Sequence, residues 1–591
     1  MATRDIIKLI GGVLKAVSTQ AAATPKLEVP YRSIDFDGGC PYDDLFPEAR
    51  HLPPPGAHTL GVAISGGGTR SAAAALGQLR GLHANGWLGR VRYLSAVSGG
   101  AWAATPFTFT GTDLAIFLGQ PRPPGEIRDD ATLQATGGEA CLGHSIADSG
   151  LTGPGLRAAL PQIVNKVVDR IGEEHEALGA ALKTALEALG PDDDQSEIYS
   201  SIIGRLFIDP HVADGGRRLF TWTDATRAEA RRLNPQLADA DFVVVPAGRP
   251  FLILGGTIIE HRPLLTYPNL IPVEYTPYYV TVRQRFGRNL GGILVSSYGY
   301  DTSEVTPRNE STAAVQTRSA KKRFTLHDVV GSTGAAPQLF FYVSDKIPDK
   351  IRGIPAGVFP EFDHWTVRDG EAHGLPTPVP HGDGGFLDNL GMMPLLARGV
   401  TRIIAFINSK GPYKENHDLM ALFGLSDRHD TNGDKRHNLV FADGRRRYDE
   451  LIADFDARVG RGTTVMHCGK SYQVVGNDRY GIRPYGDVTV CWIYNHPVEG
   501  WIGDLADTEL ARRLPVTRDG ELVKQRDAAG QEIDFDPRFE RFPWYNTFGE
   551  AKPRVMDLKP EQVNLLAHLS CWTVTNDASR TELLAQIGDA L

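Results

Sequence analysis

The stretch that decides the fold runs from residue 59 to residue 100 and contains the same unit twice. Residues 59–82 read TLGVAISGGGTRSAAAALGQLRGL, and residues 91–100 read VRYLSAVSGG. In each, a short apolar run predicts a buried strand, a glycine turn follows, and a helix begins after it. The predicted strands are Thr59 to Ile64 and Val91 to Val97, and the predicted helices are Ser71 to Leu82 and Ala101 to Phe107. This alternation is typical of an α/β fold, with a central, mostly parallel sheet flanked by helices.

The rest of the chain is interpreted as additions to this core. Residues 1–57 form a leader that ends in a stiff, proline-rich stretch. Residues 58–591 are expected to form one α/β domain, in which residues 110–240 are an inserted helical cap and residues 411–591 are an extension packed on the core. Strand-like runs return at 242–245, 251–254, 278–282, 402–407 and 488–494.

Composition excludes some classes of function. The 591 residues are 41% hydrophobic, so the chain can bury a full core. Its net charge of −9 argues against the broad basic surface of a nucleic-acid-binding protein. No window approaches the roughly 20 uninterrupted apolar residues of a membrane-spanning helix.

The leader carries one amphipathic pattern, in which apolar residues recur at helical spacing among positive charges. The apolar positions are Ile6, Ile10, Val13, Leu14 and Val17, and the basic ones are Arg4, Lys8 and Lys15. Two interpretations stay open: a helix docked on its own protein, or one lying on a membrane surface. A signal peptide is rejected because two lysines interrupt what would be its apolar centre.

The cysteines bear on the cellular compartment. There are five, an odd number, and no two are spaced as C-x-x-C; they are Cys40, Cys141, Cys468, Cys491 and Cys571. This pattern favours reduced thiols and a cytoplasmic protein, with peripheral membrane association left open.

Ser98 is the candidate nucleophile. It follows the second predicted strand at a sharp turn into a helix, which would project its hydroxyl from the sheet edge beside the following amides. The segment departs from the G-x-S-x-G pattern because Ala96 occupies the first glycine position. A small side chain there is still compatible with a tight turn.

Gly66, Gly67 and Gly68 are the candidate anion-binding turn. Three glycines after a strand let backbone N–H groups converge on an anion without interference from Cβ atoms. A phosphate-binding P-loop would need Gly-Lys followed by Ser or Thr, whereas Thr69-Arg70-Ser71 follows here. A dinucleotide fingerprint lacks its third small residue and the acidic residue after the next strand.

Asp383 is the candidate base. It lies in the segment HGDGGFLDNL, residues 381–390, just before a helix-like stretch and the apolar run at 402–407. A carboxylate held at a strand end could accept the Ser98 proton without a histidine.

Together these segments resemble the patatin-like and cytosolic phospholipase A2 families, which use a Ser-Asp dyad. The blocks that carry the resemblance are SGGGTRS at 65–71, YLSAVSGGAW at 93–102, GSTGAAP at 331–337, and Asp383-Gly384-Gly385 with Asn389 and Pro394. The 285 positions between Ser98 and Asp383 make the chain closer to the cytosolic group, because patatins are more compact.

The resemblance implies a lipid acyl hydrolase that cleaves carboxylic ester bonds of phospholipids or lysophospholipids at a membrane surface. It implies Ser98 as nucleophile, Asp383 as base, Gly66, Gly67 and Gly68 as the oxyanion hole, and Arg70 as the group that meets the substrate phosphate. It implies a capped active site. No metal, cofactor or nucleic-acid partner is expected.

Two alternatives stay open. One is an esterase or lipase of neutral lipids with a Ser-Asp-His triad, whose histidine would be His417, His467, His496 or His568. The other is a catalytically silent lipid-binding module that has kept the pocket.

Overall fold

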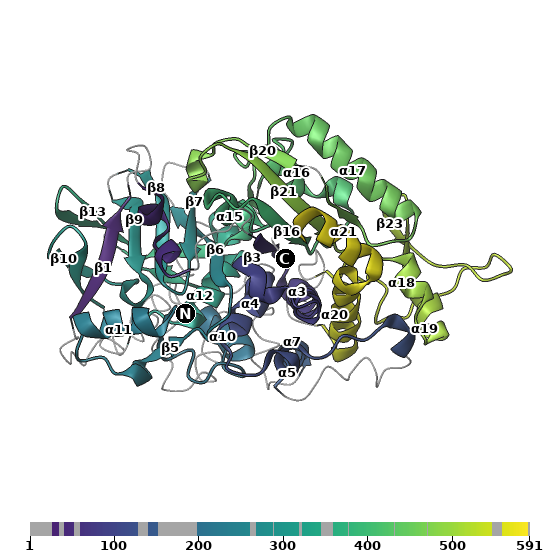
Figure 1. Ribbon diagram of the computed structural model, residues 1–591, viewed down its shortest axis with the longest axis horizontal. Helices are drawn as coiled ribbons and strands as arrows, with labels where there is room; N and C mark the ends of the chain where they lie inside the picture. The colour runs from purple at the N-terminus through teal and green to yellow at the C-terminus, as the bar shows by residue number, and fades with distance from the viewer. Residues whose placement is uncertain are drawn as a thin grey trace, which may run out of the picture.

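Both predicted strand-turn-helix units are present in the computed structural model (Figure 1). β2 spans Leu60–Ile64 and leads into α3, Gly68–Ala84; β3 spans Val91–Val97 and leads into α4, Gly99–Phe109. All five residues of β2 are buried, as expected of a strand covered on both faces. Both helices begin earlier than the sequence predicts, because their first turns start inside the glycine segments.

The structure describes residues 26–34, 41–52, 60–127, 140–151, 198–260, 267–287, 289–317, 322–343, 359–375, 377–430, 432–469, 471–546 and 558–588. The helical pattern of the leader and the helical pattern around 163–189 lie outside these residues. The cap therefore stays a prediction.

A 15-stranded sheet organises the described part of the chain, and its centre is parallel. The parallel strands, in spatial order, are β21 (Tyr485–Tyr494), β16 (Arg402–Ile407), β2, β3 and β6 (Phe251–Glu260). Beyond β6 the order continues antiparallel through β7 (Asn269–Tyr275), β8 (Tyr279–Phe286), β9 (Leu290–Ser296), β1 (Leu27–Ser33), β11 (Thr312–Gln316) and β10 (Glu304–Pro307). The prediction of a mostly parallel sheet is therefore correct for the five central strands and wrong for the strands beyond β6. Several of those strands follow one another through short turns, which favour antiparallel pairing.

The other elements complete the sheet or cover it. The remaining strands are β4 (Leu219–Thr221), β5 (Phe242–Val244), β12 (Glu361–Phe362), β13 (Trp365–Arg368), β14 (Glu371–Gly374), β15 (Val379–Asp383), β17 (His429–Asp430), β18 (Gly433–Asp434), β19 (Met466–His467), β20 (Ser471–Val474), β22 (Val516–Arg518) and β23 (Glu521–Val523). The remaining α-helices are α2 (Tyr42–Leu45), α5 (Leu114–Leu118), α7 (Leu142–Leu151), α10 (Ile198–Phe207), α11 (Asp224–Leu233), α12 (Leu326–Thr333), α13 (Ala336–Val343), α14 (Gly385–Asp388), α15 (Met393–Ala397), α16 (His417–Leu422), α17 (Gly444–Gly460), α18 (Glu499–Gly503), α19 (Thr508–Arg513), α20 (Pro560–Thr575) and α21 (Asp577–Ile587).

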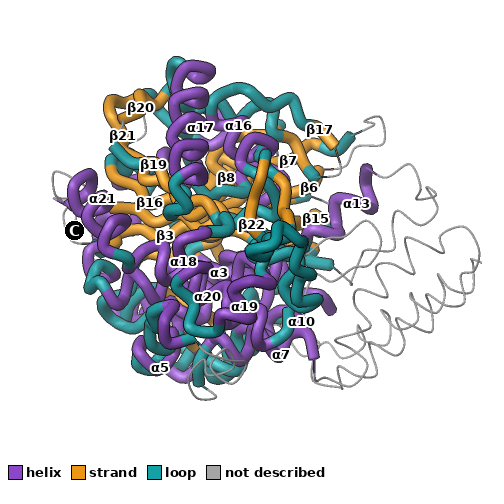
Figure 2. The backbone as a smooth tube through the Cα atoms, turned by 90° about the vertical axis from the view of Figure 1, so that its right-hand side faces the viewer, coloured by secondary structure: helices purple, strands orange, loops and turns teal. Residues whose placement is uncertain are grey.

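Helices lie on both faces of the parallel strands, as the sequence predicts. In Figure 2, α3, α20, α7 and α10 lie below the strands, while α16 and α17 lie above them. α3 is buried from Gly68 to Leu82 and packs most extensively on α20. Its run of four alanines, Ala72 to Ala75, is fully buried and lets the backbones approach closely.

The boundaries of the predicted additions need correction. Residues 27–33, assigned to the leader, form β1 inside the main sheet between β9 and β11. The region after residue 411 supplies β21, a parallel neighbour of β16, and α20, the main partner of α3. β1, β21 and α20 are therefore structural parts of the α/β core. Across the described ranges, no helix has the length and apolarity to cross a membrane.

Two of the five cysteines form a disulfide, so the expectation of reduced thiols is wrong for this pair. Cys468 and Cys491 are bonded, with Cα atoms 4.4 Å apart. The sequence spacing gives no hint of this, because the two residues become neighbours only when β19 pairs antiparallel with β21. Cys141 and Cys571 are free and buried, and Cys40 lies outside the described residues.

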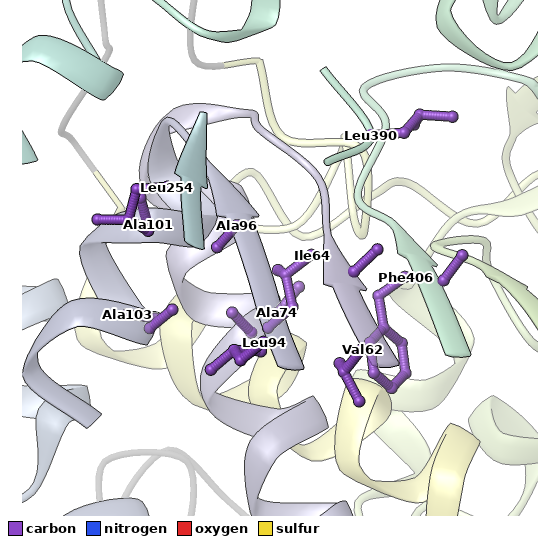
Figure 3. Packing of buried hydrophobic residues seen from close by; sticks show 14 of the residues in the cluster. Val62, Ile64, Ala74, Leu94, Ala96, Ala101, Ala103, Leu254, Leu390 and Phe406 are labelled. Atoms are coloured by element: carbon purple, nitrogen blue, oxygen red, sulfur yellow. The ribbon is translucent and has the colours of Figure 1, made fainter. Parts of the chain in front are cut away.

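The hydrophobic core lies where β2, β3 and β16 meet α3 and α4. Figure 3 shows Val62 and Ile64 of β2 beside Phe406 of β16, with Ala74 of α3 and Leu94 of β3 packed next to them. This core fixes the carboxyl ends of the parallel strands, at which ligands bind in α/β folds.

The close contact of α3 and α20 gives the first testable prediction. A Cβ on Gly77 would lie 2.1 Å from the carbonyl oxygen of Ala567, a backbone atom that cannot move aside cheaply. Gly77→Ala should therefore lower the free energy of unfolding by about 2–4 kcal/mol, measured by thermal or chemical denaturation. Gly89→Ala is the control, since a Cβ there meets nothing within 4 Å. Equal stability of the two variants would contradict the packing described here.

Candidate active site

Ser98 occupies the turn between β3 and α4 in a conformation that few residues adopt. Its φ is 52° and its ψ is −127°, and its side chain is buried at 6% exposure. A positive φ at a non-glycine residue costs energy and is characteristic of functional sites. The turn is the strained strand-to-helix corner that the sequence predicts for a nucleophile.

The two residues after Ser98 must be glycines because the glycine turn lies against them. A Cβ on Gly99 would come within 1.8 Å of the carbonyl oxygen of Gly68, and one on Gly100 within 2.7 Å of that of Ser65. The segment at 65–68 therefore runs directly alongside the Ser98 corner. Ala96, the departure from the usual pattern, is fully buried in β3 opposite Ile64 of β2.

Asp383 reaches Ser98 because two strands meet end to end along β6. β3 pairs with the first half of β6 in parallel and ends with Val97 opposite Gly255. β15 pairs with the second half in antiparallel and ends with Asp383 opposite Gly256. The carboxyl ends of β3 and β15 thus face each other across adjacent positions of one strand.

The structure brings the predicted nucleophile and base into direct contact. Ser98 Oγ donates a hydrogen bond to Asp383 Oδ2 at 2.8 Å. The other carboxylate oxygen, Oδ1, accepts from the Gly385 N–H at 2.7 Å. The Asp383 carbonyl accepts from the Thr257 hydroxyl at 2.9 Å. Asp383 is held on both sides, with one oxygen left to Ser98.

Burial governs the acidity of Asp383. Removal from water raises its pKa to about 6, and this effect outweighs the hydrogen bonds from Gly385 and Ser98 and the positive charge of Lys435, which lower it. Asp418 adds a negative charge that raises it further. A carboxylate with a pKa near 6 is a stronger base than an ordinary aspartate and is still ionised at neutral pH.

The glycine turn lies against the Ser98 corner. Gly67 and Gly68 have positive φ values of 143° and 59°, which only glycine adopts without strain. A Cβ on Gly66 would lie 3.0 Å from the Ser98 Cβ, so this turn and the nucleophile are in van der Waals contact. α3 begins at Gly68, and a helix N-terminus presents amides and a partial positive charge.

Arg70 lies behind this turn. It is only 4% exposed; its Nε donates to the Asn408 carbonyl at 3.1 Å and its Nη1 to the Tyr545 carbonyl at 2.6 Å. Its Nη2 would be 2.4 Å from a Cβ on Gly67, so the guanidinium supports the turn directly. Burial lowers the Arg70 pKa to about 10, which leaves it charged at neutral pH. Its contact with a substrate phosphate stays a prediction.

A chain of polar contacts that the sequence analysis does not predict connects the two halves of the site. Asn389 accepts the Gly66 N–H with its carbonyl at 2.9 Å and donates from Nδ2 to Asp418 Oδ2 at 2.7 Å. Lys435, 2% exposed, pairs with Asp418 Oδ1 at 2.8 Å and donates to the Gly385 carbonyl. One ion pair therefore positions both the glycine turn and the loop after Asp383.

Thr333, at the end of α12, is a second residue that the sequence analysis does not assign. Its hydroxyl accepts the Ser98 N–H at 3.2 Å and donates to the Gly255 carbonyl. Its own carbonyl accepts the Gly384 N–H at 3.3 Å. The small-residue block at 331–337 was the signal for this role, because small residues permit such close backbone contacts.

Three of the four histidines of the triad alternative bond to groups other than Ser98. His417 bonds with Ser426, His467 with Asp454, and His496 with the carbonyl of Pro497. His568 lies in α20. The Ser98 hydroxyl donates to Asp383. In the same part of the chain, no cluster of three or more His, Cys, Asp or Glu side chains could hold a metal ion.

Comparisons with known proteins add little beyond this geometry. No family model and no curated protein matches the sequence. Among solved structures, three of human GIVD cytosolic phospholipase A2 are similar: one of the enzyme, one with methyl gamma-linolenyl fluorophosphonate, and one with this inhibitor and terbium chloride. Their identities are 12%, 13% and 11%, and their TM-scores are 0.38, 0.37 and 0.36.

The matches cover 89% or 90% of this chain and 59% of that enzyme's chain. At these TM-scores the likeness carries no argument about the residues or the substrate of this protein. The site is therefore interpreted from its own geometry.

The raised pKa of Asp383 predicts a conflict between stability and chemistry. Because the native pKa lies above the ordinary value of 3.8, the native state binds the proton more tightly than the unfolded chain. Ionisation of Asp383 therefore lowers stability as pH rises from 3.8 to about 6, and the loss persists above that. Asp383→Asn should raise the free energy of unfolding at pH 7.5 by about 1–3 kcal/mol, with little gain at pH 4.

Thermal unfolding of the variant and the wild type at both pH values measures this effect. Asp487→Asn, an exposed carboxylate on β21, is the control and should change little at either pH. An Asp383→Asn variant that is less stable than the wild type at pH 7.5 would show that burial of this charge is fully compensated.

Proposed function

We propose that this chain is a lipid acyl hydrolase that cleaves carboxylic ester bonds through a Ser98–Asp383 dyad. The observation that carries the proposal is the 2.8 Å hydrogen bond from the Ser98 hydroxyl to the Asp383 carboxylate. It occurs at a strand-to-helix corner where Ser98 has a positive φ, and such backbone strain in a non-glycine residue is typical of functional sites.

The first half of the reaction forms an acyl-enzyme. Asp383 takes the proton from Ser98 Oγ as this oxygen attacks the carbonyl carbon of the ester. The carbonyl oxygen becomes an oxyanion, which the amides of Gly67 and Gly68 and the N-terminus of α3 would stabilise, with Gly66 shaping the turn. The tetrahedral intermediate collapses, and the alcohol leaves with the proton that Asp383 returns.

The second half regenerates the enzyme. Water enters, Asp383 removes one of its protons, and the resulting hydroxide attacks the acyl carbon. Collapse of this intermediate releases the fatty acid and returns the proton to Ser98 Oγ. A base with a pKa of about 6 suits both halves, since it is ionised at neutral pH and still holds a proton well enough to donate it.

Phospholipids or lysophospholipids are the proposed substrates. This choice depends on the sequence resemblance and on the arginine at position 70, whose guanidinium suits phosphate oxygens. Arg70 already donates to two backbone carbonyls, so a substrate phosphate would be an additional partner of its guanidinium. Action on such substrates would bring the protein to a membrane surface.

A fluorophosphonate probe tests the nucleophile. The wild type should be labelled on Ser98, and Ser98→Ala should abolish labelling and ester hydrolysis, whereas Ser303→Ala, an exposed control, should leave both unchanged. Asp383→Asn should lower hydrolysis by about 10²–10⁴-fold, the usual contribution of a general base. Labelling that persists in Ser98→Ala would exclude this nucleophile.

A lipid panel tests the substrate. Wild-type protein is offered vesicles of phospholipid, micelles of lysophospholipid, and emulsions of neutral glycerides, and the released fatty acid is measured. Hydrolysis of neutral glycerides alone would support the neutral-lipid alternative. Binding to vesicles without hydrolysis of any ester would support the silent module.

The pH profile tests the role of Lys435 in the proposed reaction. Its positive charge lowers the pKa of Asp383, which also faces the negative charge of Asp418 and, from α10, the phenol of Tyr199. Lys435→Met should therefore raise this pKa and move the acidic limb of kcat/KM upward by about 0.5–1 pH unit. Lys414→Met, which removes an exposed lysine paired with Asp456, should leave the limb in place.

A lower kcat/KM with an unchanged acidic limb would show that Lys435 contributes packing alone. Lys435→Arg provides a further comparison, since it keeps the charge and should keep the limb near its wild-type position.

A further inference from the structure

Three buried polar side chains far from Ser98 contain atoms with no hydrogen-bond partner among the described residues. Arg80 of α3 is 1% exposed, and Asn564 and His568 of α20 are 1% and 2% exposed. In the part of the chain that the structure describes, Arg80 Nη1, both amide atoms of Asn564 and both ring nitrogens of His568 have no partner. We call these three residues the Arg80 cluster. A buried polar atom without a partner costs about 1–3 kcal/mol, so five of them require an explanation.

The packing of α3 on α20 places Arg80 near His568. Gly77 of α3 contacts the backbone of Ala567 and Cys571, and Gly81 lies against Cys571 and Val574, so Arg80 begins beside the C-terminal half of α20, about one turn past His568. Figures 1 and 2 both show the two helices side by side, with α5 and α7 near the same end. The charge of Arg80 acts on both His568 and Cys571. Asn564 is one turn before His568 on the same helix face.

The charge of Arg80 has no acidic partner among the described residues. The titratable groups that act on it are Cys571, Cys141 and Arg122, and both thiols are held neutral by burial. Its Nε donates to the Leu118 carbonyl at 2.7 Å. His568 cannot compensate, because burial and the two arginines lower its pKa to about 3 and keep it neutral.

The other buried arginines of the described chain show what compensation looks like. Arg283 pairs with Glu274 at 2.9 Å, and Arg398 pairs with both Glu48 at 2.8 Å and Glu274 at 2.9 Å. Arg70 donates to two backbone carbonyls. Burying a cation without such partners costs several kcal/mol, which is why buried charges are paired or bind ions.

We propose that the Arg80 cluster is a binding site for one small inorganic anion, which is chloride in ordinary buffers. An anion would accept the free Arg80 Nη1 protons, a ring N–H of His568 and the amide of Asn564, and it would balance the buried charge. A monatomic ion fits better than an oxyanion, because α3 and α20 approach so closely at Gly77 that little space is left between them. This site is independent of the proposed hydrolase reaction.

Thermal unfolding in defined salts tests the site. Sodium chloride is exchanged for sodium gluconate at constant ionic strength, so that the anion alone changes. The wild-type Tm should rise with the logarithm of the chloride concentration above Kd, by about 1–2 °C at tenfold excess over Kd. His568→Leu and Arg80→Met should lose this dependence. Arg90→Met, which removes an exposed arginine at the end of the same region, should keep it.

Bromide provides a readout on wild-type crystals that does not depend on the folding of any variant. Crystals soaked in sodium bromide should show an anomalous peak within about 3.5 Å of Arg80 Nη1 and beside His568. Ordered water at this position with no anomalous peak, or a wild-type Tm that does not depend on the anion, would overturn the proposal. Stabilisation by inorganic phosphate but not by chloride would overturn the assignment of a monatomic ion.

Discussion

The candidate site depends on one constraint, the meeting of β3 and β15 end to end along the same edge of β6. Ser98 and Asp383 are separated by 285 positions in sequence, yet their strands end opposite Gly255 and Gly256, which are consecutive residues. No flexible loop has to search for this arrangement. Because β6 is one continuous strand, its two halves fix the distance between Ser98 and Asp383, and Thr333 closes the junction by bonding Ser98, Gly255 and Gly384.

Burying an ionised carboxylate costs free energy, and the groups around Asp383 reduce that cost. The Asp383 carboxylate keeps two hydrogen bonds, and Lys435, whose charge lowers the pKa of Asp383, pairs with Asp418. This arrangement lowers the cost of the charge without neutralising the base by a direct salt bridge. A direct partner would lower the pKa further and weaken the proton acceptor. The positive charge of Lys435, which is paired with Asp418, therefore favours the ionised form of Asp383 while its pKa stays above that of an ordinary aspartate.

The sequence predicts what depends on local pattern. The strands before the two glycine turns, the helices after them and the Ser98 corner all follow from short-range periodicity and turn chemistry, and all are present. The contact between Ser98 and Asp383 was predicted from the family resemblance and not from local pattern, because the two residues come together only in the folded chain. Asp418 and Lys435 were not predicted, because an ion pair between residues in a polar, unpatterned stretch leaves no local signal. The Cys468–Cys491 bond was missed for the same reason, since strand pairing alone brings the two cysteines together.

The C-terminal third, predicted as an extension packed on the core, is part of the machinery of the site. It supplies β21 beside β16, the Asp418–Lys435 ion pair near Asp383, and the Tyr545 carbonyl that holds Arg70 beneath the glycine turn. It also supplies α20, whose contact with α3 determines the position of the helix that begins at Gly68. The amides proposed to hold the oxyanion are therefore oriented by residues hundreds of positions downstream. An isolated segment ending after β16 would contain Ser98 and Asp383 but would lack the supports that align them.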